Sequence, residues 1–391
     1  MLKALSPPAG DGDPGIADAA RRLNACGIES RPCSTSRPRS SSTSRRAPPA
    51  PPRSTSARST VAPSHRASPA PTPSASSAAT PPRPARAPAN EAGGARGVVY
   101  ASREVHMSIP KAVALLGLGR ANLRLVETDE RQRLRVDALE RAMADDVAAG
   151  RVPVAVVACA GTVSTGAVDP LEAVADVAAR HGAWLHVDGA YGALAALAAP
   201  AKLAGLARAD SLSLDPHKWL YQAVDCGCLL YRDRSAARRA FSHTGAYAAS
   251  LTDDPVEGFA FFDESLELSR RFRALRLWTS IRYHGLAAFR EAIAQDLGHA
   301  QRLARLVEAD PRLELLAPVE LSAVCFRRRF GADADARNAA ILAAVNRRGR
   351  VYLSNAVVNG AFALRACFTN HRTTEADVDA VVEEVTAAGP A

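Results

Sequence analysis

Beyond the first hundred residues, short apolar segments alternate with amphipathic ones, and this alternation constrains the fold more than any other feature of the sequence. The run Val152–Ala160 is continuously apolar, which is typical of a parallel strand buried on both faces of a sheet. It lies between a predicted amphipathic helix over Val136–Ala148 and a predicted helix over Pro170–His181, which we expect Asp169 to cap. Helices and strands at this spacing form βαβ units, so the sequence predicts an α/β fold with a mostly parallel sheet.

The remaining predicted elements divide the chain into two parts. Up to residue 284 we expect further strands at 98–101, 124–127, 184–188, 211–214 and 226–232, and helices at 107–116 and 266–283. From residue 285 we expect helices at 285–308, 334–347 and 374–387, the last capped by Thr373 or Thr374, and strands at 322–327, 351–353 and 362–368. The sequence therefore predicts a large domain over 98–284 and a small α+β domain over 285–391.

The first 97 residues differ in composition from the rest. They hold 14 basic and 5 acidic residues, and this excess of nine equals the formal charge of +9 of the whole 391-residue chain. Between Arg31 and Ala89 the chain is almost wholly Ser, Pro, Arg, Ala and Thr, with Val61 as its one large aliphatic residue. Such a segment cannot bury enough apolar surface to offset its conformational entropy, so we expect residues 1–97 to be a disordered tail.

Three interpretations of this tail stay open. A basic arm could bind nucleic acid through counterion release. Charge runs without interleaved aromatic residues are more often merely solvated. The same composition also arises when a GC-rich coding sequence is read in the wrong frame, and because the change near Gly97 is abrupt, a frameshift is a third hypothesis.

Composition excludes several classes of protein. After Gly97 the chain holds 35 basic and 35 acidic residues, so no nucleic-acid partner is expected of the folded part. No run approaches the ~20 apolar residues of a membrane span, so no membrane partner is expected. The seven cysteines form neither CxxC pairs nor a dense disulfide pattern, and no ligand spacing predicts a metal site. Without the apolar stretch of a secretory signal after the N-terminus, we expect a cytoplasmic protein.

Two polar clusters follow predicted strands. WLHVDGAY (184–191) places Asp188 at the C-terminal end of a strand, where open α/β sheets bind ligands, although by spacing alone Asp188 could equally cap a helix. SLSLDPHKW (211–219) places Lys218 between a histidine and a tryptophan at the end of another strand. Burial there lowers the pKa of a lysine and frees its neutral amine for a Schiff base, although a lysine can also extend to the surface.

These clusters resemble those of the pyridoxal-phosphate-dependent group II amino-acid decarboxylases, the family of aromatic-L-amino-acid and glutamate decarboxylases. HVDGAYG (186–192), DPHKW (215–219) and FRALRLW (272–278) carry the resemblance, which runs from about Val98 to the C-terminus. It implies the PLP-dependent transferase fold of type I, with pyridoxal 5'-phosphate as cofactor and an L-amino acid as substrate. It further implies a decarboxylase, which is a carbon–carbon lyase, that assembles as a homodimer.

The resemblance also assigns roles around the cofactor ring. Lys218 would form the Schiff base, and Asp188 would pair with the pyridinium nitrogen so that the ring can accept electrons. Ala190 would pack beneath the ring. His106, in ASREVHMS (101–108), matches the histidine that stacks on the ring, although a lone histidine here could simply lie at a helix edge.

Further residues match the family around the cofactor phosphate and the substrate. Thr162, in CAGTVSTGAVD (159–169), would face cofactor and substrate, or form only a local turn through its hydroxyl; Val163 stands where many members have a second threonine. His217 would hydrogen-bond the phosphate, and Asp215 occupies a position often taken by asparagine. Both could instead serve only local structure.

A predicted lid and a basic helix complete the resemblance. Tyr247 lies 29 residues after Lys218 in the polar segment 242–255, and it matches the loop tyrosine thought to protonate the substrate carbon after carbon dioxide leaves. It could also be an ordinary exposed tyrosine. The arginines of 268–278 could meet an acidic substrate or line a solvated face.

One family feature is missing from the sequence. Members carry, upstream of the His106 region, a Gly/Ser/Thr-rich turn that holds the cofactor phosphate, and the nearest candidate here is Glu91-Ala-Gly-Gly-Ala. We therefore expect weak cofactor binding or low activity. Two alternatives to decarboxylation stay open: another fold-type-I enzyme, such as an aminotransferase or lyase, and an inactive protein that binds through its basic tail. Trp219 and Tyr247 favour decarboxylation, and Trp219 favours an aromatic substrate.

Overall fold

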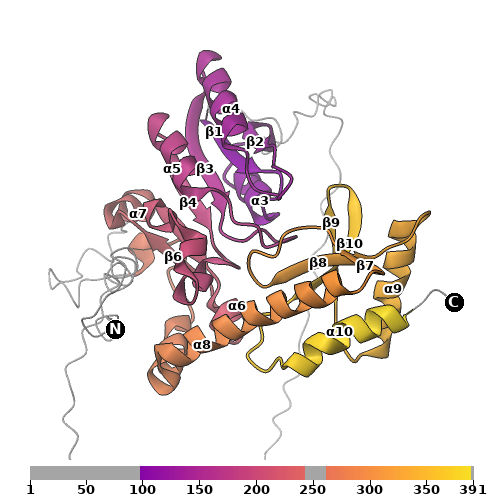
Figure 1. Ribbon diagram of the computed structural model, residues 1–391. Helices are drawn as coiled ribbons and strands as arrows, with labels where there is room; N and C mark the ends of the chain where they lie inside the picture. The colour runs from indigo at the N-terminus through magenta and orange to yellow at the C-terminus, as the bar shows by residue number, and fades with distance from the viewer. Residues whose placement is uncertain (1–96, 243–260, 389–391) are drawn as a thin grey trace, which may run out of the picture. The chain divides into compact units, whose positions relative to one another are not determined.

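The computed structural model describes residues 97–242 and 261–388, which form a six-stranded and a four-stranded sheet (Figure 1). The first sheet has the strand order β2-β1-β3-β4-β5-β6. Its strands are β1 (Gly97–Ser102), β2 (Leu123–Val126), β3 (Val152–Cys159), β4 (Trp184–Asp188), β5 (Ser211–Leu214) and β6 (Cys228–Tyr231). β1 to β5 pair in parallel and β6 pairs antiparallel with β5. The prediction of a mostly parallel sheet is confirmed.

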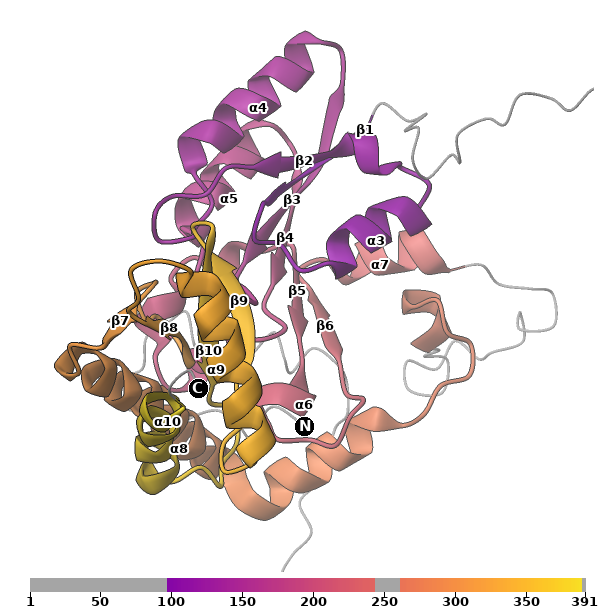
Figure 2. The same ribbon diagram turned by 90° about the vertical axis from the view of Figure 1, so that its right-hand side faces the viewer.

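Helices pack on both faces of this sheet (Figure 2). α4 (Val136–Ala148) and α5 (Leu171–Arg180) bury apolar side chains against one face, and α3 (Ser108–Leu115) covers part of the other. The second half of β3 is buried on both faces, as predicted. Its first half is not, because Val152 and Val154 remain 56% and 43% exposed.

Asp169 does not cap α5, contrary to the prediction. Pro170 is the N-cap residue and makes no capping bond through its side chain. The Asp169 carboxylate is buried and accepts backbone N–H groups from Leu134 and Cys159, both at 2.7 Å. It therefore ties the loop before α4 to the end of β3.

A long helix begins close to the Lys218 turn and continues to the second sheet. α8 (Arg273–Ala309) follows α6 (Pro216–Trp219) and α7 (Arg234–Phe241), and Gly285 interrupts it with the non-helical angles φ 78° and ψ 156°. The helix predicted from Leu266 thus begins later, at Arg273, and α7 was not predicted. Short 3₁₀ helices complete this part of the chain: η2 (Arg120–Asn122), η3 (Ala193–Leu197), η4 (Pro200–Leu203), η5 (Leu206–Arg208) and η7 (Phe261–Glu264).

The second sheet is antiparallel throughout, with the order β7-β8-β10-β9. Its elements are β7 (Leu313–Leu315), β8 (Ala323–Arg328), α9 (Ala334–Arg348), β9 (Ser354–Val358), β10 (Ala361–Cys367) and α10 (Glu375–Ala387). The strand predicted at 351–353 is wrong, because pairing starts only at Ser354, and β7 was missed. Asn359 and Gly360 connect β9 to β10 with positive φ angles of 49° and 81°, as a two-residue hairpin turn requires. Thr374 caps α10, as predicted.

α8, α9 and α10 bury their apolar side chains against one face of the second sheet. Both sheets belong to one compact unit of the chain, so the division into domains at 284/285 stays a prediction. Within the described ranges, no helix is long and apolar enough to cross a membrane. The predictions for residues 1–96, for Glu91-Ala-Gly-Gly-Ala and for Tyr247 lie outside the described residues.

Candidate active site

The predicted site residues that the structure describes lie at or just beyond the C-terminal edge of the large sheet. β1, β3, β4 and β5 are neighbouring parallel strands, so their carboxyl ends meet at one edge. His106 and Thr162 follow β1 and β3 by a few residues, Asp188 ends β4, and Lys218 lies just after β5. Open α/β sheets bind ligands at this edge. Topology therefore brings together residues that are up to 112 positions apart in the sequence.

Asp188 is oriented by the neighbouring strand and by its own loop. Its Oδ1 accepts the Ser213 hydroxyl at 3.1 Å and the Ala190 backbone N–H at 3.2 Å. Its second oxygen accepts no hydrogen bond from the described part of the chain. Asp188 is not a helix cap, because the next element, η3, starts only at Ala193. The carboxylate is thus held in place with one oxygen left for a ligand.

The turn after Asp188 needs a glycine. A Cβ atom on Gly189 would lie 2.3 Å from the Cβ of Ala193 and 2.9 Å from the carbonyl oxygen of Ser213. Real Cβ contacts are never so short, so any side chain here would displace the backbone that carries Asp188. Ala190, predicted to lie beneath the cofactor ring, follows in the same turn and is partly exposed.

Lys218 is less buried than predicted. Its side chain is 39% exposed, and its Nζ lies 2.9 Å from Oδ2 of Asp215. The charge is therefore balanced by a carboxylate and reaches solvent, and the expectation of a desolvated amine is wrong for this state of the chain. Asp215 acts here as the partner that fixes the direction of the amine.

His217 is engaged locally. Its Nδ1 lies 2.8 Å from the carbonyl oxygen of Cys226, and its Nε2 lies 3.6 Å from Oδ2 of Asp215. The Cys226 contact ties α6 to the start of the segment that leads into β6. This is the local structural role left open for His217 and Asp215, and a phosphate contact would have to use Nε2.

Thr162 and His106 also make local contacts. The buried Thr162 hydroxyl lies 3.1 Å from the Thr165 hydroxyl and accepts the Ala167 backbone N–H at 3.2 Å, as in the local-turn alternative. The exposed His106 places its Nδ1 2.8 Å from the Ser108 hydroxyl at the start of α3, which is the helix-edge alternative. No contact within the described residues joins either side chain to Lys218 or Asp188.

The second sheet supports the Thr162 loop. The carbonyl oxygen of Ser164 accepts a hydrogen bond from Nε of Arg365 at 2.9 Å and from the Cys325 thiol at 3.1 Å. Nearby, the Tyr191 hydroxyl lies 2.7 Å from the Ser322 hydroxyl and accepts the Ser322 backbone N–H at 3.0 Å. The loops after β3 and β4 are thus both held by β8 and its neighbours.

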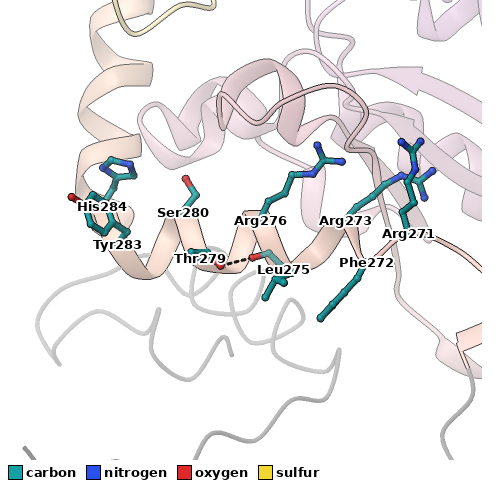
Figure 3. A pocket seen from close by; sticks show the side chains of 9 residues that line it. All are labelled: Arg271, Phe272, Arg273, Leu275, Arg276, Thr279, Ser280, Tyr283 and His284. Carbon is teal, nitrogen blue, oxygen red and sulfur yellow. Dashed lines mark hydrogen bonds between the residues drawn. The ribbon is translucent and has the colours of Figure 1, made fainter. Parts of the chain in front are cut away.

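The arginines of 268–278 hold a neighbouring loop, a role that the sequence did not predict. Arg271 and Arg273 contact the Asp225 carboxylate at 2.8 and 3.0 Å, and Arg276 donates to the Asp225 carbonyl at 2.6 Å. They fix the loop between α6 and β6. A hollow of about 660 Å³ lies along this stretch of α8, lined by the residues of Figure 3, and none of the residues predicted to hold the cofactor lines it.

The sequence missed several residues that shape the site. Ser213 was visible only as part of the alternating pattern SLSL, which places both serines on one face of β5. Tyr191 and Trp219 belong to the quoted motifs, but their stacking at 5.1 Å is a tertiary contact. Asp225 and Asp296 carried no signal, because each acquires its partners from distant parts of the chain.

Comparison with known proteins identifies the family. The family model described as "Pyridoxal-dependent decarboxylase conserved domain" matches residues 85–329. The chain belongs to the pyridoxal-dependent decarboxylase family. Tryptophan decarboxylase 1 of Oryza sativa subsp. japonica is 38% identical over 286 residues, which are 70% of this chain and 56% of that protein. Aromatic-L-amino-acid decarboxylase of Bacillus atrophaeus is 36% identical over 308 residues, 75% of this chain and 64% of that protein.

Solved structures of this family confirm the fold-type-I prediction. The structure of Oryza sativa TDC with PLP and tryptamine superposes with a TM-score of 0.71 at 37% identity, covering 76% of this chain and 63% of that one. Catharanthus roseus tryptophan decarboxylase in complex with L-tryptophan gives a TM-score of 0.67 at 32% identity, covering 75% and 61%. The chain thus spans about three-fifths of the length of these relatives.

Proposed function

We propose that this member of the pyridoxal-dependent decarboxylase family decarboxylates an L-amino acid with pyridoxal 5'-phosphate as cofactor. The observation that carries the proposal is the placement of the Asp188 carboxylate at the end of β4 and of the Lys218 amine just after β5, the neighbouring parallel strand. Family membership supports the same chemistry. When bound, pyridoxal phosphate supplies an electron sink that lets carbon dioxide leave the substrate.

The described residues fit the ring of this cofactor. Lys218 offers a primary amine that is 39% exposed, which the cofactor aldehyde requires. Asp188 offers an oriented carboxylate to a ring nitrogen, and Gly189 and Ala190 keep its turn free of bulky side chains. Asp215 would direct the amine through its contact of 2.9 Å and could hold the proton that Nζ must release before it reacts.

Within the described ranges, fewer donors fit the cofactor phosphate. His217 spends Nδ1 on the Cys226 carbonyl, and the Thr162 hydroxyl is turned into its own loop. A phosphate dianion with few donors binds weakly. We therefore expect this chain to bind pyridoxal phosphate more weakly than a protein with a complete phosphate-binding turn.

For the substrate we propose an aromatic L-amino acid. The support is that relatives are named for tryptophan, tyrosine and aromatic L-amino acids. Trp219 no longer supports this choice, because its side chain is fully buried and donates to Asp296 rather than facing a ligand. A second candidate is an oxidative reaction that forms an aldehyde, with carbon dioxide and ammonia leaving and dioxygen as the two-electron acceptor, because phenylacetaldehyde synthases of Petunia hybrida and a Rosa hybrid cultivar are 34% and 33% identical to this chain.

Three further features remain part of the proposal. Tyr247 would donate the proton that replaces the carboxylate. Tyr247→Phe should therefore lower kcat for amine formation and change KM for the substrate much less. A homodimer and a cytoplasmic location follow from the resemblance and the composition. Sedimentation of the purified protein at several concentrations tests the homodimer.

Because the chain has few lysines, a cofactor label can be assigned to one of them. The chain has four, at positions 3, 111, 202 and 218. Incubation with pyridoxal phosphate, reduction with borohydride and peptide mass spectrometry should place the label on Lys218 well above the other three. Lys218→Arg keeps a cation beside Asp215 and should abolish that label. Equal labelling of all lysines would overturn the cofactor assignment.

The reaction is tested by its products. Carbon dioxide and the amine should form from L-tryptophan or L-tyrosine in the wild type and not in Lys218→Arg. An aldehyde would favour the second candidate, and a keto acid would favour an aminotransferase. If Lys218 takes the label in the reduction experiment but the unreduced protein forms no product from any aromatic amino acid, the proposed reaction is overturned and the cofactor site is not.

A further inference from the structure

The helix that carries Lys218 cannot hold its own position. α6 has only four residues, far fewer than an isolated helix needs to be stable. Its place must therefore be fixed by the side chains around it. Trp219, the next residue, is fully buried, and its indole Nε1 donates to Oδ2 of Asp296 at 3.1 Å. Tyr221 donates its hydroxyl to the same oxygen at 2.9 Å.

Asp296 is an unusual residue in this place. It lies on α8, 77 positions after Trp219, and is 1% exposed. Among the described residues it forms no ion pair. Burial raises the pKa of its carboxyl, and the hydrogen bonds from Tyr221 and Trp219 act in the opposite direction. A buried carboxylate is destabilising unless hydrogen bonds satisfy it, and both side-chain bonds to Asp296 come from residues that follow Lys218.

Tyr221 shows that the turn after Lys218 is held under strain. Its φ angle is 52°, in the left-handed region that a bulky residue rarely adopts. Its hydroxyl is bound by Asp296 and its ring lies 6.5 Å from that of Phe289, also on α8. The turn therefore depends on α8 for its conformation.

The indole of Trp219 also touches the other half of the site. It stacks on Tyr191 with ring centroids 5.1 Å apart and an interplanar angle of 29°. Tyr191 lies three residues after Asp188, and its hydroxyl is fixed by Ser322. The Trp219–Tyr191 contact therefore connects the turn of Lys218 to the loop of Asp188.

We propose that Asp296 is a positioning residue that sets the placement of Lys218 relative to Asp188 by holding Trp219 against Tyr191. Both groups would contact the same rigid cofactor, so an error in their spacing is costly: a misplacement of 1 Å in such a site can lower its efficiency about a hundredfold. The expected effect on cofactor binding rests on the proposed function, whereas the contacts of Asp296 with the Lys218 turn do not.

The test compares Asp296→Leu, which removes both side-chain bonds at once, with variants that keep one or both of them. Asp296→Leu removes the acceptor, whereas Asp296→Asn keeps an oxygen that can still accept from Trp219 and Tyr221. Trp219→Phe keeps a ring beside Tyr191 and removes one donor. Asn338→Leu is the matched control, because Asn338 is also fully buried and polar but bonds only to carbonyls and an N–H of its own region, at Arg328 and Ala334.

Two readouts are measured on each full-length variant. The first is the dissociation constant of pyridoxal phosphate, with the circular dichroism of its visible band. The second needs no cofactor: acetylation of Lys218 by an N-hydroxysuccinimide ester, relative to Lys111 and Lys202 in the same molecule. Asp296→Leu should weaken cofactor binding tenfold or more, change the visible dichroism and alter the Lys218 ratio. Asp296→Asn should restore most of each, and Asn338→Leu should change none.

The outcomes separate this inference from the proposed function. If the wild type binds no pyridoxal phosphate, the proposed function fails, and the acetylation ratio alone then decides the role of Asp296. An Asp296→Leu protein whose Lys218 ratio stays within twofold of the wild type would overturn the inference. So would an equal change in Asn338→Leu, since it would show that loss of stability alone moves the lysine.

Discussion

Removal of the Tyr191 hydroxyl should destabilise the protein strongly. Tyr191→Phe deletes one oxygen atom and keeps the ring that stacks on Trp219. The lost oxygen holds two groups of Ser322, its hydroxyl at 2.7 Å and its backbone N–H at 3.0 Å, and Ser322 is fully buried. No water can replace the lost acceptor without opening the contact between the loop after β4 and the second sheet.

The size of the effect follows from these two bonds. A buried donor left without an acceptor costs about 1–3 kcal/mol, and the hydroxyl pair contributes about another 1 kcal/mol. We therefore expect Tyr191→Phe to lower the free energy of unfolding by about 2–4 kcal/mol, a large share of the 5–15 kcal/mol typical of a folded protein.

Urea unfolding measures this loss. Tyr191→Phe should lower the urea midpoint with little change in the slope, because the same surface is exposed on unfolding. Tyr352→Phe is the matched control, because Tyr352 is 83% exposed and its hydroxyl can bond to water in both states. A loss below about 0.5 kcal/mol in Tyr191→Phe, the range of ordinary surface changes, would refute the reasoning.

Three other changes test the local geometry. Gly189→Ala places a Cβ 2.3 Å from that of Ala193, so it should lower the unfolding free energy by about 1–3 kcal/mol and weaken cofactor binding, as measured by thermal unfolding and cofactor titration. Gly331→Ala places its Cβ in open space and should change neither quantity. Burial raises the pKa of Asp169 from 3.8 to about 6, so its contribution to stability is greatest below pH ~3.8 and is lost as the pH rises through ~6. Between pH ~3.8 and ~6 the free energy of unfolding of the wild type, measured by urea unfolding, should therefore fall by about 3 kcal/mol relative to that of Asp169→Asn. The same pH dependence in both proteins would contradict this. Asn359→Val and Asn359→Gly both lose the hydrogen bond that the Asn359 side chain accepts from Gln132 at 2.6 Å, but only valine forces a β-branched residue into a φ of 49°, so Asn359→Val should lower the midpoint of thermal unfolding by the equivalent of roughly 1–2 kcal/mol more than Asn359→Gly does.

The elements of the large sheet were predictable because their signals are local. β4 and β5 have the predicted bounds, and α4 does as well, since a short apolar run or a 3.6-residue periodicity needs no information from elsewhere in the chain. The predictions were wrong where a local pattern competes with contacts from elsewhere in the chain. Asp169 has a residue type and position typical of a helix cap, but two backbone N–H groups from other elements took its carboxylate.

The second sheet shows the same limit. The strand expected at 351–353 lies instead at Ser354–Val358, because the Asn359–Gly360 turn sets the register of the hairpin with β10. The dipeptide was a usable signal, since Asn-Gly between apolar runs is typical of a two-residue hairpin. β7 has only three residues and carries no pattern of its own.

The sequence by itself determined the α/β class, the two strand ends that carry Asp188 and Lys218, and the resemblance that led to the family. These depend on residue types and spacings along one stretch of chain. Only the tertiary structure decided how the groups are held: Lys218 partly exposed beside Asp215, Thr162 turned into its own loop, and the lysine turn fixed by Asp296. Burial and hydrogen-bond partners depend on pairs of residues, and Trp219 and Asp296, 77 positions apart in the sequence, meet only because α8 packs against the Lys218 turn.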